Sequence, residues 1–255
     1  ILAGGFSKER EISLKTAKGV FNEIKKKYIV KICEPNGELI SNLRSFKPNV
    51  VFNALHGRYG EDGYIQTILE SEKVRYTHSG VLSSSLAIDK EISKKLFVKN
   101  KILTPKFIKY KFKKKINKID LLKVVKKKLG FPVVIKPLNE GSSVNVSICN
   151  NKNLIQKIVK LKEYGEILIE KYIPGREIQV AILSDKVLGA IELKPKRKFY
   201  DYEAKYNPKA KTEHIIPVNL NKTQYKLVSN AALKAHKLLK CRGVTRSDFR
   251  FFDNK

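Results

Sequence analysis

Hydrophobic and polar positions in the first third of the chain switch between strand-like and helix-like patterns. Mostly apolar runs at 28–33 and 49–55 are typical of buried strands. After Ser7, an N-cap candidate, apolar residues recur at helical spacing, and a further helix is expected at 64–71. These alternating β and α units predict a small parallel sheet with helices on both faces.

The rest of the chain predicts further mixed α and β structure. We expect three domains, at 1–87, 88–170 and 171–255, and prolines at 105 and 174 mark breaks in the pattern. Residues 199–217 have no clear periodicity and are expected to form a long functional loop. The other expected helices are 84–100, 119–129, 153–163 and 223–240, and the other expected strands are 106–112, 131–136, 144–149, 166–172, 176–183, 187–194 and 244–252.

Composition is typical of a soluble globular protein, with 42% hydrophobic and 30% charged residues. No apolar run approaches the roughly 18 residues of a membrane helix, so no membrane partner is expected. The cysteines are Cys33, Cys149 and Cys241, far apart and without a Cys-x-x-Cys pair. This spacing favours a reducing compartment and argues against a disulfide framework or a zinc site.

The formal net charge of +29 raises the possibility of a nucleic-acid-binding protein. Only nine of the 53 basic residues are arginine, however, and arginine is the preferred reader of phosphates and bases. The lysines are spread along the whole chain, as a genome biased toward A and T would produce. The densest basic run, 109–115, is expected to be an exposed edge strand followed by a solvated turn. We therefore expect no nucleic-acid partner.

A first candidate binding motif lies at 133–143. A buried strand ends in Lys136, and a tight turn with Gly141, Ser142 and Ser143 follows. Backbone N–H groups and hydroxyls in such a turn bind phosphate oxygens, and the lysine supplies positive charge. The alternative is a polar hairpin whose lysine extends into solvent.

A second candidate motif lies at 167–177. An apolar strand ends in Glu170, Lys171 and Tyr172, and the chain resumes in a new direction after Pro174 and Gly175. Extended backbone there offers donors and acceptors to a purine edge, and acids to ribose hydroxyls. The alternative is an exposed strand end with solvated charges.

Together the two motifs resemble the nucleotide clamp of the ATP-grasp fold. Over nearly the whole chain the sequence is similar to the D-alanine–D-alanine ligase family. The resemblance implies an α/β protein with an N-terminal parallel-sheet, Rossmann-like domain, followed by two α+β ATP-grasp subdomains, the last one truncated. Five stretches carry it, at 4–14, 54–63, 87–90, 140–143 and 199–206.

The resemblance also implies a role for each matching residue. Glu9 receives the ammonium of the first D-alanine with His56 beside it, Arg246 stabilises a negative oxygen on the reacting carboxyl, and Asp248 is one metal ligand. The implied catalytic group is Glu9, Ser142, Tyr206 and Arg246. The implied ATP contacts are Lys90, Lys136, Ser142, Ser143, Glu170, Lys171, Tyr172, Ile173, Glu177 and Lys205.

The implied activity is the ATP-dependent joining of two D-alanines through an acyl phosphate, for peptidoglycan precursors in a bacterial cytoplasm. The implied cofactors are ATP and Mg²⁺ (or Mn²⁺), and the implied assembly is a homodimer. The glycine pair Gly4–Gly5 then belongs to a loop for the amino-acid substrate, because Glu9 would repel a phosphate but suits an ammonium. Charge neutralisation by lysines fits phosphoryl transfer, which needs little covalent help from a protein.

Both ends of the chain look cut, since methionine is absent and the last residues stop before another strand. We expect a fragment that lacks the glutamate and asparagine completing the metal site in the family, and therefore expect the segment alone to be inactive. Three alternatives stay open. The first is a ligase that joins D-alanine to D-lactate or D-serine, although Tyr206 favours D-alanine over D-lactate as the second substrate. The second is a basic nucleic-acid-binding protein, and the third is an ATP-grasp remnant without catalysis.

Overall fold

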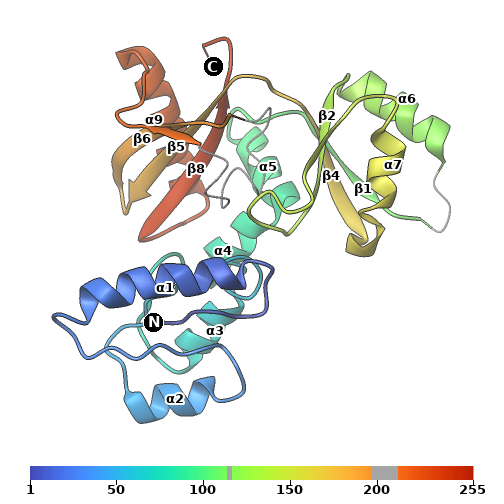
Figure 1. The fold of residues 1–255 in the computed structure, drawn as a ribbon. Helices are drawn as coiled ribbons and strands as arrows, with labels where there is room; N and C mark the ends of the chain where they lie inside the picture. Colours follow the sequence, from blue (N-terminus) through green and yellow to red (C-terminus); the bar gives the residue numbers. More distant parts are fainter. Residues whose placement is uncertain (114–116, 197–211, 255) are drawn as a thin grey trace. The chain divides into compact units, whose positions relative to one another are not determined.

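Separate stretches of the chain combine into two units in the computed structural model, which describes residues 1–113, 117–196 and 212–254 (Figure 1). Unit 1 consists of Ile1–Ile88 with His236–Thr245, and unit 2 consists of Asp89–Ala235 with Arg246–Lys255. A short segment near the C-terminal end therefore belongs with the N-terminal residues. The division into three domains stays a prediction.

Unit 1 pairs its apolar segments in parallel, through single bridges. Leu2 bridges both Cys33 and Asn53, and Val51 bridges Tyr76. The runs expected as strands at 28–33 and 49–55 are thus much shorter than predicted. In the first run Tyr28 and Ile29 are exposed and only Cys33 pairs, so the apolar pattern overstated the strand.

Helices cover both faces of these parallel segments, as the alternating pattern predicted. Neighbouring residues of an extended segment point to opposite faces. Ala3 and Ala54 accordingly meet Ala17 of α1, while Leu2 and Leu55 meet α2 and α3 in a larger apolar cluster. The helices are α1 (Arg10–Ile24), α2 (Leu39–Phe46), α3 (Tyr64–Ser71) and α4 (Val81–Ile88).

The first sheet of unit 2 is antiparallel, with strand order β1-β4-β2-β3. One face is apolar and packs on α6 and α7, through residues such as Val133, Ile135, Ile167 and Ile169. The opposite face presents Lys136 and Glu170, because side chains alternate along each strand. The elements are β1 (Phe107–Lys111), β2 (Val133–Pro137), β3 (Ser147–Cys149), β4 (Glu166–Lys171), α5 (Lys90–Lys99), α6 (Lys118–Lys128), α7 (Leu154–Val159) and the 3₁₀ turn η1 (Lys162–Tyr164).

The second sheet of unit 2 has strand order β7-β6-β5-β8. The expected hairpin is present, since β5 and β6 pair antiparallel around the turn at Ser184–Asp185. Ile178, Val180 and Ile182 of β5 are fully buried against the helix α9. The elements are β5 (Arg176–Leu183), β6 (Lys186–Lys194), β7 (Glu213–Ile215), α9 (Lys222–Leu238) and β8 (Val244–Phe251).

Two further predictions need correction. The single helix expected at 84–100 is two helices, because Asp89 has extended backbone and its carboxylate caps α5 by accepting from the N–H groups of Glu91 and Ile92. The strand expected at 144–149 shrinks to β3, because Asn145 has positive φ. The edge position of β1 agrees with its lysine-rich pattern. None of the helices in the described residues has the length and apolar character of a membrane span.

Candidate active site

The loop before α1 in unit 1 holds Glu9 in a buried position. Its side chain is among the buried charged groups of the chain, at 4% relative exposure. The helix begins one residue later, so Glu9 is the N-cap and Ser7, the predicted cap, lies two residues earlier. Ser7 still supports the turn, because its Oγ accepts from the Glu9 N–H at 3.2 Å. The loop thus fixes the backbone at Glu9, the acid for which the family resemblance implies an ammonium partner.

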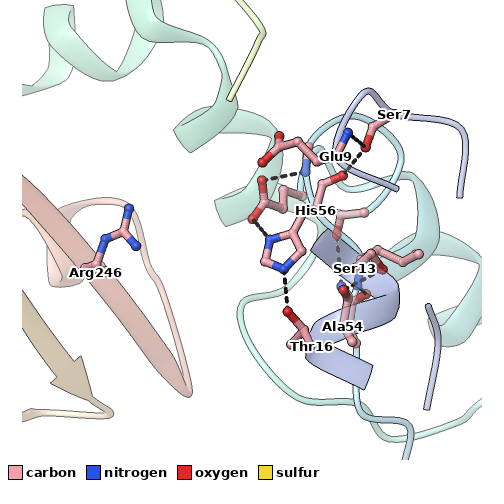
Figure 2. Close-up of polar contacts among 12 residues, drawn as sticks. Ser7, Glu9, Ser13, Thr16, Ala54, His56 and Arg246 are labelled. Atoms are coloured by element: carbon pink, nitrogen blue, oxygen red, sulfur yellow. Dashed lines mark hydrogen bonds and ion pairs between the residues drawn. The ribbon is translucent and has the colours of Figure 1, made fainter. Parts of the chain in front are cut away.

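His56 lies in the same network, as Figure 2 shows. Its carbonyl accepts from Ser7 Oγ at 2.7 Å, and its Nε2 is 3.2 Å from Thr16 Oγ1. Its Nδ1 is 4.0 Å from Glu61 Oε1. A Cβ on the next residue, Gly57, would lie 2.8 Å from Glu9 Oε2, and the positive φ of Gly57 also favours glycine. The structure therefore places Glu9 and His56 in the same network, and their roles at a substrate stay a prediction.

Buried polar residues that the sequence reasoning missed hold this network in place. Ser13 Oγ accepts from the Gly4 N–H at 2.9 Å and donates to the Ala54 carbonyl at 2.8 Å. Asn53 Nδ2 and Gln66 Nε2 both donate to the Gly60 carbonyl, at 2.9 and 2.8 Å. A serine four residues into a helix after a glycine pair is a weak sequence signal, because most such serines face solvent.

In unit 2, Lys136 and Glu170 form an ion pair on the polar face of the first sheet. Strand pairing sets Val134 opposite Glu170, so Lys136, two residues further along β2, is a diagonal neighbour of Glu170. Lys136 Nζ is 2.5 Å from Glu170 Oε1, and Lys94 Nζ on α5 is 3.0 Å from Glu170 Oε2. Burial alone would raise the pKa of Glu170, but the two ammonium groups outweigh it and lower this pKa.

Lys90 is the next cation of this cluster and binds the turn after β2. Its Nζ donates to the carbonyls of Leu138 at 2.9 Å and Glu140 at 2.5 Å. Burial, and then repulsion by Lys136, lower the pKa of Lys90 to about 8. A buried ammonium with a depressed pKa gains from a nearby anion, so this corner of the sheet is suited to negative charge.

The turn that follows has the tight geometry expected of it. Ser142 and Ser143 both have positive φ, at 45° and 61°. Asn145, also at positive φ, donates its side-chain amide to the Tyr164 hydroxyl at 2.7 Å. Lysine charge beside a turn of this shape is a chemical arrangement that binds oxyanions.

The charged side chains at 170–177 contact other residues of the protein at positions where the resemblance implied contacts to ATP. Glu170, expected at the adenine, directs its carboxylate to lysines, while Lys171 is exposed. Glu177 Oε2, expected at the ribose, accepts from Arg250 Nη1 at 2.6 Å. Arg250 also donates to the carbonyl of Ile173 at 3.2 Å, so this β8 arginine, missed by the sequence reasoning, fixes the segment after β4.

Arg246 and Asp248 lie two residues apart on β8 and form a bidentate pair. Arg246 Nε and Nη2 donate to the two oxygens of Asp248 at 2.7 and 3.0 Å. No group of three or more metal-ligating side chains occurs in the described parts of the chain. These residues therefore supply one carboxylate toward a metal, not a complete site. Lys205 and Tyr206, the predicted residues of the long loop, lie outside the described residues.

The chain combines a parallel-paired first unit with two antiparallel four-stranded sheets and a lysine cluster beside a serine turn. That combination agrees with the ATP-grasp class of enzymes, which the sequence resemblance implied. Residues 96–255 match the family model described as "D-ala D-ala ligase C-terminus". The chain belongs to the D-alanine–D-alanine ligase family.

Individual relatives agree with this membership. A D-alanine–D-alanine ligase of Pelagibacter ubique (strain HTCC1062) is 61% identical over 256 residues, covering 100% of this chain and 84% of the relative. A crystal structure of the D-alanine–D-alanine ligase from Bacillus anthracis is 34% identical with a TM-score of 0.84, covering 99% of this chain and 82% of that one. A crystal structure of a D-alanine–D-alanine ligase from Bacillus anthracis complexed with ATP is 30% identical with a TM-score of 0.81. It covers 100% of this chain and 81% of that one. A nucleic-acid-binding protein is therefore not favoured.

Proposed function

We propose that the protein joins two D-alanine molecules with the consumption of ATP, for peptidoglycan precursors in the cytoplasm. One observation carries the proposal. The cluster of Lys90, Lys94, Lys136 and Glu170 sets three ammonium groups against one carboxylate beside a serine turn. Such a cluster is suited to a polyphosphate, the relatives are named D-alanine–D-alanine ligases, and one similar solved structure is complexed with ATP.

The lysines would act on the phosphates of ATP. A carboxylate is a poor electrophile, so its oxygen first attacks the γ-phosphorus to give an acyl phosphate and ADP. Lys136 and Lys90 neutralise charge on the phosphates during this transfer, which is mainly an electrostatic task. Lys90 would exchange its carbonyl partners at Leu138 and Glu140 for phosphate oxygens, which favour its protonated form.

The first D-alanine would bind at the loop before α1. Glu9 offers a buried carboxylate to its ammonium, and His56 lies in the same network. The amine of the second D-alanine then attacks the acyl carbon and phosphate leaves. Arg246 would stabilise the negative oxygen of that tetrahedral state, after exchanging one contact with Asp248. Ser142, in unit 2, and Tyr206, which lies outside the described residues, are proposed as further contacts of the amino-acid substrate.

ATP would also need contacts to its base and sugar. The backbone of 170–173 is the proposed adenine site, and Glu177, held by Arg250, the proposed ribose site. Ser143 and Lys205 are proposed as further phosphate contacts. For Mg²⁺ the described residues do not form a complete donor set, since Asp248 is the one carboxylate in place and Arg246 binds both of its oxygens.

The test is product formation from ATP and D-alanine by a chain of the relatives' full length, of which this one covers 84% in the Pelagibacter ubique enzyme, because the 1–255 segment alone is expected to be inactive. Chromatography of the dipeptide and assay of released phosphate follow the reaction. We expect phosphate release that depends on D-alanine and equals the dipeptide formed. Absence of dipeptide under conditions where ATP binds would support the non-catalytic remnant instead.

Two finer points complete the proposal. We propose D-alanine as the second substrate, on the basis of Tyr206, and a homodimer as the assembly. D-alanine, D-serine and D-lactate should compete at neutral pH with dipeptide as the main product, and preferred formation of the ester or of the serine product would overturn the choice. Sedimentation at micromolar concentration tests the dimer, and a monomer there would overturn it.

A further inference from the structure

Lys94 occupies a position that is unusual for lysine. It lies on α5 with 7% relative exposure, and lysine is almost never this buried without a partner. Its Nζ is 3.0 Å from Glu170 Oε2 and donates to Thr104 Oγ1 at 2.6 Å. The ammonium also lies 5.2 Å from the ring centroid of Phe107. These contacts fix the Lys94 ammonium against one oxygen of Glu170.

Glu170 is shared between an inner and an outer lysine. Its Oε1 binds Lys136 and its Oε2 binds Lys94. The side chain of Lys94 is 9% exposed and that of Glu170 is 10% exposed, whereas that of Lys136 is 21% exposed. The outer lysine can therefore reach a ligand, and the inner lysine cannot without leaving its site.

Sharing has an electrostatic consequence. One carboxylate cannot neutralise two ammonium groups, so the trio keeps a formal positive charge. Because Lys94 pairs with Glu170 from the buried side, it offsets part of the negative charge of the carboxylate. Glu170 therefore orients Lys136 without neutralising the positive charge of Lys136. A buried ion pair is a poor source of stability compared with apolar packing, so a lysine buried as deeply as Lys94 needs another explanation.

We propose that Lys94 is a positioning residue of the nucleotide site, which acts through Glu170 to aim Lys136 and keep it positively charged toward phosphate. The proposal rests on the proposed function, since it takes Lys136 as a phosphate contact. Lys94 itself touches neither substrate nor reacting atoms.

Replacing Lys94 should weaken ATP binding specifically. In Lys94→Met, Glu170 has only Lys136 to balance its charge, so Lys136 is neutralised and attracts phosphate less. Coupled buried charges predict that the Kd for ATP rises about 10-fold, with a range of a few-fold to 100-fold. Lys94→Arg keeps the charge and should bind ATP within a few-fold of the original protein. The D-alanine site lies in unit 1, and its affinity should not change.

A second change separates positioning from mere stability. Glu170→Gln keeps an acceptor for Lys136 but removes the negative charge, so the double variant Lys94→Met/Glu170→Gln should regain ATP affinity relative to Lys94→Met. Melting temperature is recorded alongside. A purely structural role would lower the melting temperature of Lys94→Met and leave its ATP affinity unchanged.

Isothermal titration calorimetry with ATP tests this on the whole chain, with Lys95→Met as matched control. Lys95 is the next residue on α5, is 66% exposed and pairs with Glu91, so its loss should leave ATP affinity unchanged. Folded Lys94→Met with the original ATP affinity would overturn the positioning role and leave the proposed function standing. An original protein that does not bind ATP would instead refute the proposed function.

A last comparison covers a Lys94→Met protein that does not fold. Glu170→Gln and the double variant should then bind ATP equally, because Lys94 acts through the carboxylate. If the double variant binds about 10-fold more weakly than Glu170→Gln, Lys94 acts independently of Glu170 and the proposal is wrong.

Discussion

Raising the pH above 8 should weaken ATP binding while it stabilises the nucleotide-free fold, and Lys90 is the reason. Burial, followed by repulsion from Lys136, lowers the pKa of this lysine from 10.5 to about 8. A polyphosphate binds the protonated form, so affinity should fall by up to about tenfold for each pH unit above this pKa. At pH 8, where about half of Lys90 is charged, binding should take up about half a proton.

The stability of the nucleotide-free protein should change in the opposite direction. Because the folded pKa of Lys90 lies below its unfolded value, the unfolded chain binds more protons between pH 8 and 10.5, and stability rises with pH in that window. The shift corresponds to about 3 kcal/mol at most across the window. Urea unfolding at several pH values measures this rise, and Lys90→Met should remove part of the slope.

Calorimetry at pH 8 in two buffers of different ionisation enthalpy measures the proton uptake directly. Lys90→Arg is the matched control, since arginine stays charged at this pH and should take up no proton. ATP contributes little, because a terminal phosphate titrates near pH 6. Equal binding enthalpies in both buffers, together with a flat affinity from pH 7 to 9, would refute the reasoning.

Three substitutions in unit 1 test the amino-acid site. Glu9→Gln should raise the KM for D-alanine strongly and leave the Kd for ATP unchanged, in steady-state assays paired with ATP titrations; a collapse of nucleotide affinity would make the loop a phosphate site. Ser13→Ala leaves the Gly4 N–H and the Ala54 carbonyl without their hydrogen-bond partner, so the free energy of unfolding in urea should fall by about 1–3 kcal/mol. An unchanged free energy of unfolding would contradict this role of Ser13. Gly57→Ala places a Cβ near Glu9 in a residue with positive φ, so the free energy of unfolding should fall by about 1–3 kcal/mol in the same assay. An unchanged urea midpoint would contradict this geometry.

Local patterns predicted the elements better than their ends. Alternating β and α units predicted helices on both faces of a parallel arrangement, and Ala3 and Leu2 meet different helices as neighbours in an extended segment should. The pattern could not show that Tyr28 and Ile29 lack a neighbouring strand. Asp89 is a residue type that caps helices, and a new helix begins after it. The apolar spacing on either side of Asp89 nevertheless predicted one continuous helix.

For the candidate site, the sequence indicated single residues but not their partners. Lys136 and Glu170 were chosen for different ligand groups, and the strand register makes them diagonal neighbours. Lys94 was missed because a lysine in a charged helix resembles a solvated residue, and its burial depends on how α5 packs on the sheet. Arg250 was missed for the same kind of reason, since its contact to Glu177 joins distant parts of the chain.

The most direct measurement follows oxygen from substrate to phosphate. D-alanine labelled with ¹⁸O in its carboxylate is incubated with the protein and ATP, and the products are analysed by mass spectrometry. If the carboxylate attacks the γ-phosphorus and the second amine then displaces phosphate, one labelled oxygen leaves in each phosphate and D-alanyl-D-alanine accumulates equally. Dipeptide formed with unlabelled phosphate would contradict the acyl-phosphate route, and ATP consumption without dipeptide would contradict the ligase function itself.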